Sequence, residues 1–595
     1  MLQRELPADL QHRIDSYLQQ EPLQEYRLFI QKLVEQAQSG HLPALQQLQH
    51  RFEPLQFGTA GLRAAMAAGE GCINHVTVCR VAWALGQHLL HGYDTQQLAK
   101  QGVVIGHDAR HNSLDFAEAM AAVLTGLGVA VHLFDVAVPT PVCAFTTVAL
   151  RALGAAMVTA SHNPATDNGV KIYRSDGAQM MENDSVPIAQ LMQQAPSVST
   201  MVCLSQQQQR QLGLRHVVEQ KTIDAYFAAI TALPVYHNHQ QQPKRIKVVH
   251  TPLHGVARDW AVRALHEAGF DRVHVVPQQA DPNPQFPTTP YPNPQDPHAL
   301  QLAIKQAQQL SADLLLANDP DADRLAVCVP NAATGAWEML DGNAIGVLLA
   351  DWILSCCQRS SGVKPLVVTT VVSSRLLSCI AQHYGASYAE SLTGFRHIAQ
   401  TVRQHHAAHH HQQFVFGYEE ALGYCLSPTL VEKDGICAAA AFARLFVQLQ
   451  QQGKTVQQQL DELALQHGLH HTHQFSLAFA GATGAQRMAE VMVYLRSNPQ
   501  LLPHGAGWQQ QQVMFCDLLQ GDGNFPKANV LVWQVAQQGR IVARPSGTEP
   551  KMKFYVELTQ RVDTLKQLQQ TRQQLQQRCE QIQADITQLL LTHAA

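Results

Sequence analysis

Residues 155–164 read AAMVTASHNP, a run of small and apolar residues that leads directly into a turn containing Ser161. Such a run is typical of a buried strand, and Pro164 prevents the segment from continuing as a regular strand or helix. Ser161 therefore stands at a strand end, between a small residue and a histidine. Taken alone, this turn is compatible with a nucleophile, a phosphate carrier or a simple N-cap.

Strand and helix patterns alternate on both sides of this turn. Apolar strand-like runs at 103–106 and 129–135 enclose a helical pattern at 114–126. This rhythm favours mixed or parallel sheets flanked by helices. This rhythm restarts twice further along the chain. The strand-like runs there are 244–255, 272–276, 314–319, 365–374 and 414–423, and a helical pattern lies at 343–355.

The last part of the chain has a different pattern. Strand-like runs at 475–481, 530–535 and 539–547 precede a Gln-rich helical pattern at 562–591, which indicates a smaller α+β domain. At the other end, Leu23, Tyr26, Ile30 and Leu33 have helical spacing. We therefore predict a helical extension (1–50), α/β domain I (51–230), α/β domain II (231–340), α/β domain III (341–468) and α+β domain IV (469–595).

Composition narrows the function classes. The 595 residues are 46% hydrophobic and 15% charged, with a net charge of −4, so no overall positive field would attract nucleic acid or a membrane surface. The N-terminus lacks the apolar core of a signal peptide, and no window reaches the length of a membrane span. Twelve cysteines without CxxC pairs favour reduced thiols. We expect a cytoplasmic protein, a monomer or weak dimer, with no nucleic-acid or membrane partner.

Three compositionally biased segments are expected to be loops. Proline density makes 277–297 an extended loop, and the Gln tract 206–211 and the His-rich stretch 405–411 are expected to be exposed loops.

The segment 318–324, NDPDADR, follows an apolar run and has the chemistry of a cation site. Asp319, Asp321 and Asp323 alternate along one turn, so their carboxylates are expected to converge on one point. Hard oxygen ligands suit a divalent cation such as Mg²⁺, and three such charges would repel one another without a cation. Arg324 would offer a fork to a phosphate oxygen.

Three further loops carry groups that suit a phosphorylated ligand. The loop 543–551, ARPSGTEPK, combines an arginine, two hydroxyls, a glycine and a lysine, which make an anion cradle or a capped turn. The loop 57–63, FGTAGLR, suits close backbone approach to an anion. The loop 417–423, GYEEALG, places two carboxylates where they could accept hydrogen bonds from sugar hydroxyls, or they could be plain surface charges. Since no triad partner or GxSxG elbow accompanies Ser161, a serine facing a metal favours a phosphoryl carrier.

TASHNP, DPDADR, GYEEALG and RPSGTEPK, in this order, resemble the four signature loops of the α-D-phosphohexomutase family. The resemblance runs from about residue 50 to the C-terminus. FGTAGLR, HTPLHG, TGFR and RPSGTEPKMKFY look most like the branch of bacterial phosphoglucomutases and phosphopentomutase-like enzymes. The family's fold implies four domains around a central cleft: three related α/β units and a C-terminal domain with a mobile phosphate-binding loop.

The resemblance also implies roles for residues. Ser161 would be carried as phosphoserine, and one Mg²⁺ per chain would be held by Asp319, Asp321, Asp323 and an oxygen of phosphorylated Ser161. A sugar bisphosphate such as glucose 1,6-bisphosphate would be the intermediate and activator. Residues implied around the transferring phosphoryl group are Arg63, His162, Lys171 and Arg324. Residues implied in substrate binding are Thr59, Arg396, Glu419, Glu420, Arg544, Ser546, Gly547, Thr548 and Lys551.

Two departures concern the substrate. Ala421 stands where many hexose enzymes of the family carry serine, and Arg396 and His397 stand where relatives commonly carry Lys and Trp. We expect an enzyme that interconverts glucose 1-phosphate and glucose 6-phosphate. Phosphomannomutase and phosphopentomutase activities stay open, as do a metal-dependent sugar phosphatase and a non-enzymatic sugar-phosphate-binding protein.

Overall fold

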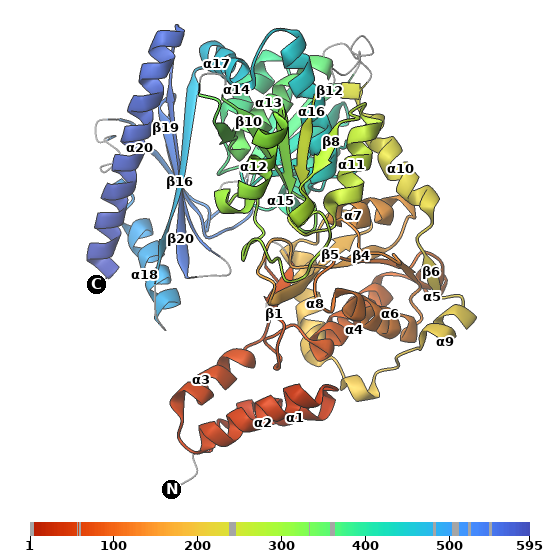
Figure 1. Cartoon of the computed structure of the whole chain (residues 1–595). Helices are drawn as coiled ribbons and strands as arrows, with labels where there is room; N and C mark the ends of the chain where they lie inside the picture. Colours follow the sequence, from red (N-terminus) through yellow and green to blue (C-terminus); the bar gives the residue numbers. More distant parts are fainter. Residues whose placement is uncertain are drawn as a thin grey trace. The chain divides into compact units, whose positions relative to one another are not determined.

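The computed structural model describes residues 5–594 apart from a few short segments: 56, 59–60, 237–245, 332–333, 358–362, 480–482, 503–507, 509–510, 522–524 and 547–549. Contacts divide the chain into two compact units, Met1–Met339 with Gly423–Ala443, and Leu340–Leu422 with Arg444–Ala595. Figure 1 labels the helices and strands.

The N-terminal extension forms three helices, α1 (Ala8–Gln20), α2 (Gln24–Gln38) and α3 (Leu42–Arg51). Ile30 and Leu33 are buried in their shared core, as their spacing predicts, together with Ala68 and Val76 from the segment that follows. Leu23 differs from expectation: it precedes α2 and is 46% exposed. Leu23 has an extended backbone conformation, so its side chain does not lie on the same helical face as Ile30 and Leu33.

The first sheet of the first unit has the strand order β1-β5-β4-β2-β3-β6. Strands β2, β3, β4 and β6 are parallel, and β5 and β1 add antiparallel at one edge. The strands are β1 (Leu62–Ala65), β2 (Val103–His107), β3 (Val131–Leu133), β4 (Gly154–Val158), β5 (Asp167–Arg174) and β6 (Arg215–Val217). Its helices are α4 (His75–Gly92), α5 (Thr95–Lys100), α6 (Ser113–Gly126), α7 (Thr140–Ala149), α8 (Glu182–Gln194), α9 (Gln206–Gln211) and α10 (Gln220–Thr231). Because helices cover β2 and β4, every residue of both strands is buried, as in parallel sheets generally.

The second sheet of this unit has the order β11-β10-β9-β7-β8. The strands are β7 (Val248–Thr251), β8 (Val273–Val275), β9 (Leu314–Asn318), β10 (Leu325–Pro330) and β11 (Trp337–Met339), and the helices are α11 (Ala257–Glu267) and α12 (Gln301–Leu310). The proline-rich loop 277–297 contains only short 3₁₀ turns at its ends. β15 (Gly423–Cys425) and the start of α16 (Gly435–Gln451) also belong to this unit.

The second unit holds a parallel sheet and an antiparallel sheet. The parallel strands run β13-β12-β14, and the antiparallel order is β16-β20-β19-β18-β17. The strands are β12 (Lys364–Thr370), β13 (Ser387–Ser391), β14 (Gln412–Glu419), β16 (Leu469–Ala478), β17 (Met514–Asp517), β18 (Leu531–Val535), β19 (Gly539–Pro545) and β20 (Lys551–Gln560). The helices are α13 (Gly342–Cys357), α14 (Leu376–His383), α15 (Phe395–Ala408), α17 (Val456–His467), α18 (Gly484–Ser497) and α20 (Leu565–Ala594). Figure 1 shows α20 running along β16.

The predicted strand and helix runs are confirmed, but one predicted loop is wrong and another is wrong in part. The Gln tract forms α9, where Ser205 makes a capping box with Gln208. In the His-rich stretch, residues 405–408 form the last turn of α15, and residues 409–411 are an exposed loop. A cap is enough to start a helix in a sequence without strong turn residues. All twelve cysteines lie within the described residues and are free thiols, as expected. In the part of the chain that the structure covers, no helix has both the length and the apolar character to cross a bilayer.

Candidate functional site

Ser161 lies three residues beyond the end of β4, in a turn with an unfavourable backbone conformation. Its φ is +53°, in the left-handed region that non-glycine residues rarely occupy, and the residue is 1% exposed. The Ser161 amide donates to Thr159 Oγ1 (2.9 Å), and Thr159 Oγ1 donates to Asp108 Oδ2 (2.7 Å). Strain of this kind persists where surrounding contacts fix it, and it concentrates at functional sites.

Arg110 holds the rest of this turn in place. Its guanidinium donates to the carbonyl oxygens of Ser161 (2.6 Å), Asn163 (2.6 Å), Pro164 (2.7 Å) and Asp167 (3.0 Å). Asp108 lies 3.3 Å from Arg110 Nε and balances its charge. Asp108 and Arg110 were not predicted from the sequence. A signal was present, because both follow β2 directly and ligands of parallel sheets bind at the carboxyl ends of strands.

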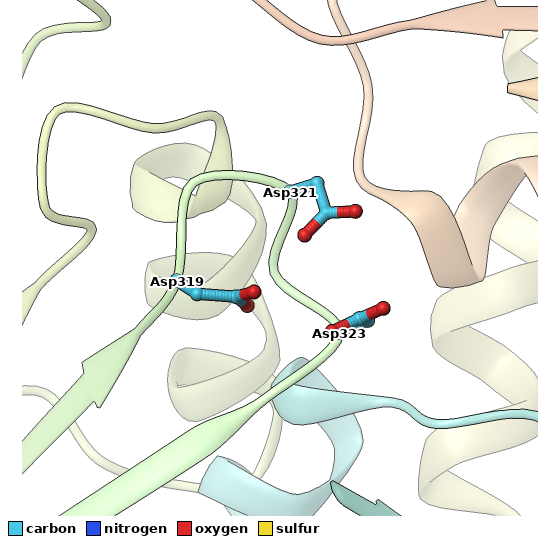
Figure 2. Close-up of side chains that lie close together, drawn as sticks. All are labelled: Asp319, Asp321 and Asp323. Atoms are coloured by element: carbon cyan, nitrogen blue, oxygen red, sulfur yellow. The ribbon is translucent and has the colours of Figure 1, made fainter. Parts of the chain in front are cut away.

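The three aspartates of the second sheet meet the serine turn. Figure 2 shows Asp319, Asp321 and Asp323 projecting from the loop between β9 and β10 to the same side. Each offers a carboxylate oxygen, and these oxygens all lie within 4.8 Å of one another. Ser161 Oγ donates to Asp319 Oδ2 at 2.8 Å. The three carboxylates therefore converge as predicted, and Ser161, which the family resemblance places with them, lies in contact with Asp319.

A glycine allows this loop to sit where it does. A Cβ on Gly255, in the HTPLHG segment, would lie 2.2 Å from Pro320 Cα, well inside the contact distance. The Val256 amide donates to the Pro320 carbonyl at 2.9 Å, which fixes the loop from this side. Close backbone packing thus positions the aspartates.

The aspartate cluster has the properties of a divalent-cation site. All three residues are buried, and burial together with the negative charges of Asp321 and Asp323 raises the pKa of Asp319 to about 8. Among the described residues, no hydrogen-bond donor reaches Asp321 Oδ1 or Asp323 Oδ1. Buried carboxylate oxygens without a donor, close to one another, are the ligands that Mg²⁺ accepts, so the residues present fit the ion.

Lys171, on β5, is part of this cluster. Its Nζ donates to Asp321 Oδ2 (2.6 Å) and Asp323 Oδ2 (2.7 Å), and it is 3% exposed. Burial opposes its charge, but the two carboxylates raise its pKa above the ordinary value. Lys171 is therefore a fixed cation beside the aspartates.

Further cationic side chains face the same place. Arg63, on β1, donates through Nη1 to Asn163 Oδ1 (3.2 Å), and Arg324 Nε lies 3.9 Å from Asp323 Oδ1. The Nε atoms of Arg63 and Arg324 are buried without a hydrogen-bond acceptor among the residues that the structure describes. Lys433 Nζ, 3.1 Å from Asp323 Oδ2, was missed, since nothing in its local sequence marks it. The structure thus brings Arg63, Arg324 and the unpredicted Lys433 together around Ser161 and the aspartates, with donors that suit a phosphoryl group.

His162 lies beside the serine hydroxyl, with Nδ1 3.2 Å from Ser161 Oγ. Burial and the positive charges of Arg324 and Arg63 lower its pKa well below the ordinary value. The imidazole is therefore neutral near neutral pH, and it cannot supply a positive charge to the site there.

The second unit contains the predicted sugar-binding carboxylates, at the end of β14. The Gly394 amide donates to Glu419 Oε1 (2.6 Å), and Ser373 Oγ donates to Glu420 Oε2 (3.2 Å). Burial and the negative charge of Glu419 raise the pKa of Glu420. Glu419 is 7% exposed and Glu420 is partly buried, so neither is a plain surface charge.

Arg544, at the end of β19, is close enough for its positive charge to act on Glu420. Its Nη2 donates to the Tyr555 hydroxyl (3.2 Å), and its Nε is buried without an acceptor among the described residues. The Ser546 amide donates to the Lys551 carbonyl (2.7 Å), which closes the base of the β19–β20 loop. Arg396 is buried in the first turn of α15. The predicted residues Thr59, Gly547 and Thr548 lie outside the described residues.

Four stretches of the chain match the domains of one protein family. Residues 54–198 match "Phosphoglucomutase/phosphomannomutase, alpha/beta/alpha domain I", 224–334 match domain II, 341–466 match domain III and 528–574 match the C-terminal domain. The chain therefore has three α/β domains followed by a C-terminal domain. The residues at which we place their boundaries stay predictions.

Individual proteins agree with this match. The chain is 35% identical to a probable phosphomannomutase of Haemophilus influenzae over 82% of this chain and 93% of that protein. It is 32% identical to a phosphoglucomutase of Staphylococcus epidermidis over 85% and 91% of the two chains. A phosphoglucomutase/phosphomannomutase family protein of Burkholderia thailandensis has a similar solved structure, with a TM-score of 0.63, 20% identity and coverage of 90% and 97%.

Proposed function

Because the chain belongs to the phosphoglucomutase/phosphomannomutase family, we propose that it interconverts glucose 1-phosphate and glucose 6-phosphate through a phosphorylated Ser161. Its general activity, that of a hexose phosphate mutase, follows from its relatives. The observation that carries the proposal is the 2.8 Å contact between Ser161 Oγ and Asp319, beside two further carboxylates and several cations. A hydroxyl so placed suits a phosphoryl carrier.

The reaction consists of two transfers in opposite directions. In the first, a sugar hydroxyl loses its proton as its oxygen bonds to the phosphorus on Ser161, the bond from phosphorus to Oγ breaks, and Oγ takes up that proton. The bisphosphorylated sugar, glucose 1,6-bisphosphate, then turns within the site. In the second, Oγ bonds to the phosphorus at the other end of the sugar, that sugar oxygen leaves with a proton, and phosphoserine is restored.

Each nearby side chain has a proposed part in these steps. His162, with Nδ1 3.2 Å from Ser161 Oγ, takes the proton of the attacking hydroxyl and gives it to the leaving oxygen: from the sugar to Oγ in the first transfer, and from Oγ to the sugar in the second. Arg63, Arg324 and Lys433 bind the oxygens of the transferring group, and Lys171 holds Asp321 and Asp323 in place. Asp319, Asp321, Asp323 and an oxygen of phosphorylated Ser161 would hold one Mg²⁺, which would stabilise negative charge on the transferring group.

The second unit contributes the residues proposed to bind the rest of the substrate. Glu419 and Glu420 accept hydrogen bonds from sugar hydroxyls, and Arg544 binds the phosphate that is not reacting. The other residues proposed for that phosphate are Arg396, Ser546, Gly547, Thr548 and Lys551. Holding both ends of the substrate keeps the reacting oxygen aligned in either orientation.

A coupled assay with glucose, mannose and ribose 1-phosphates, each with glucose 1,6-bisphosphate and Mg²⁺, tests this function. We expect glucose 1-phosphate to give the highest kcat/KM, with inorganic phosphate released far more slowly than glucose 6-phosphate forms. A preference for mannose or ribose would contradict the assigned substrate. Phosphate release at a rate comparable with isomer formation would indicate a phosphatase instead.

Lys433 is expected to contribute to turnover because its Nζ lies among the groups that face the transferring phosphoryl group. Lys433→Met should lower kcat by about tenfold to a hundredfold, since a hydrogen bond to a charged group is worth roughly 1.5–3 kcal/mol. Steady-state kinetics with glucose 1-phosphate measure this. The matched control is Lys454→Met, which removes an ion pair with Glu462 on the other unit and should leave kcat unchanged. Equal kcat values for the two variants would rule out the role of Lys433.

Glu420 is expected to act on substrate binding. Glu420→Gln should raise the KM for glucose 1-phosphate by about tenfold, because a neutral amide accepts a hydroxyl hydrogen bond less strongly than a carboxylate does. The same substitution at the exposed Glu490 is the control. An unchanged KM in Glu420→Gln, with the substrate still saturating, would show that Glu420 does not contact the sugar.

A further inference from the structure

One face of the C-terminal sheet carries charged residues that the proposed chemistry does not use. Side chains alternate along a strand, so Arg540, Val542 and Arg544 of β19 share a face. Glu557 of β20 lies directly opposite Arg540 in the strand register, and Tyr555 lies opposite Val542. Arg540 and Glu557 are 3% and 5% exposed, so this is a buried charged pair on the same face as the phosphate-binding Arg544.

Arg540 and Glu557 both bind the segment that follows β12, residues 371–375, which we call the Ser373 turn. Arg540 donates through Nη2 to the Ser373 carbonyl (2.9 Å) and through Nη1 to Glu390 Oε1 (2.8 Å). Glu557 Oε1 accepts from Ser374 Oγ (2.8 Å) and from the Arg375 amide (2.8 Å), and its Oε2 accepts from Arg375 Nε (2.7 Å). The cross-strand pair therefore holds the backbone of this turn on both sides of Ser374.

The other side of the same turn holds the sugar-binding carboxylate. Ser373 Oγ donates to Glu420 Oε2 (3.2 Å) and accepts from the Glu420 amide (3.2 Å). Residue 373 thus contacts Arg540 through its carbonyl and Glu420 through its hydroxyl. A continuous set of hydrogen bonds connects Glu420 to the strand that carries Arg544.

Apolar contacts alone would already hold the sheet against the turn. Val371, Val372 and Leu392 form one core cluster with Val542 and Tyr555. Apolar packing has no direction, and a buried ion pair is often no more stabilising than hydrophobic residues of the same volume. Hydrogen bonds are directional. The bonds of Arg540 and Glu557 to the backbone of the Ser373 turn therefore fix the position of that turn along the strands.

We propose that Arg540 and Glu557 are positioning residues of this enzyme: by holding the Ser373 turn, they fix the distance between the sugar-binding Glu420 and the phosphate-binding Arg544. This inference rests on the proposed function of those two residues. A hexose phosphate contacts both groups at once, so its binding depends on their spacing. Inorganic phosphate cannot contact both subsites in the same way, so its binding does not depend on that spacing.

Glu557→Gln tests this role, because it keeps the side-chain volume but places an amide NH₂ group against donors. We expect the KM for glucose 1-phosphate to rise by about tenfold, while the inhibition constant of inorganic phosphate changes by less than about twofold. An unchanged KM would overturn the proposal. An inhibition constant that rises as much as KM would also overturn it, because the phosphate subsite itself would then be damaged.

Two further variants separate positioning from stability. Arg540→Met should raise KM in the same way, and Arg540→Lys, which keeps a donor for the Ser373 carbonyl, should recover most of the loss. Arg572→Gln breaks an ion pair with Asp461 in the same unit, so its unfolding temperature should fall while its KM stays at the wild-type value. If KM rose in every variant whose unfolding temperature fell, including Arg572→Gln, Arg540 and Glu557 would only stabilise the fold.

The wild-type enzyme distinguishes a failure of this inference from a failure of the proposed function. Turnover of glucose 1-phosphate by the wild type, with an unchanged KM in Glu557→Gln and Arg540→Met, would overturn the positioning role alone. An absence of turnover in the wild type would overturn the proposed function, and the positioning role with it.

Discussion

Replacing Ser161 by alanine is expected to lower the turnover of glucose 1-phosphate by on the order of 10⁴-fold or more, the usual cost of removing a nucleophile. Ser161 Oγ is the only atom of that side chain able to carry the phosphoryl group, and neighbouring donors cannot replace it. The fold should survive. Alanine, like serine, carries a Cβ, so the φ of +53° at position 161 has about the same conformational free-energy cost for either residue. The lost contacts are the hydrogen bonds of Oγ with Asp319 and with His162.

The measurement is the coupled assay, with circular dichroism and thermal unfolding to show that the variant is folded. Ser355→Ala is the control, since the Ser355 Oγ donates to the Trp352 carbonyl within α13. Turnover close to wild type in folded Ser161→Ala would exclude a phosphoserine route.

Removing divalent cation is expected to have the next-largest effect. Excess chelator should abolish turnover and added Mg²⁺ should restore it, because the buried carboxylates of Asp319, Asp321 and Asp323 need a cation to balance them. Asp323→Asn should raise the Mg²⁺ concentration for half-maximal activity by more than about tenfold, since one anionic ligand becomes neutral. Its contacts to Lys171 and Lys433 would weaken as well.

Titration of activity against Mg²⁺ after chelation measures both effects. Asp296→Asn serves as the control, because the Asp296 carboxylate accepts from the His298 amide at the start of a short 3₁₀ helix. Full activity in excess chelator would contradict a metal site at these aspartates. An unshifted titration curve for Asp323→Asn would remove that residue from the ligand set.

Much of the site formed by Ser161 and the three aspartates could be predicted, because short stretches of sequence mark each part of it. Apolar runs marked β4 and β9, and their ends placed Ser161 and the aspartate loop. Three aspartates at alternate positions on one short loop converge whatever surrounds them. The contact of Ser161 with Asp319 could not be derived in this way, since it depends on how two sheets pack.

The residues that escaped prediction act over long sequence distances. Arg110 binds carbonyl oxygens of a loop in another part of the sequence, and Lys433 reaches Asp323 from a loop with no distinctive pattern. Arg540 and Glu557 were missed for a different reason. A charged residue that alternates with apolar ones along a strand reads as solvent-facing, and only packing against the Ser373 turn buries this pair.

Whether Ser161 carries the phosphoryl group can be measured by mass spectrometry of the protein after reaction with a sugar bisphosphate. Dephosphorylated wild-type protein is incubated with glucose 1,6-bisphosphate and Mg²⁺, and its intact mass and peptides are measured. We predict the addition of one phosphoryl group, located on Ser161, and its loss when glucose 1-phosphate or glucose 6-phosphate is added in excess. Continued mutase turnover by protein that never carries phosphate on Ser161, or carries it on another residue, would exclude Ser161 as the phosphoryl carrier.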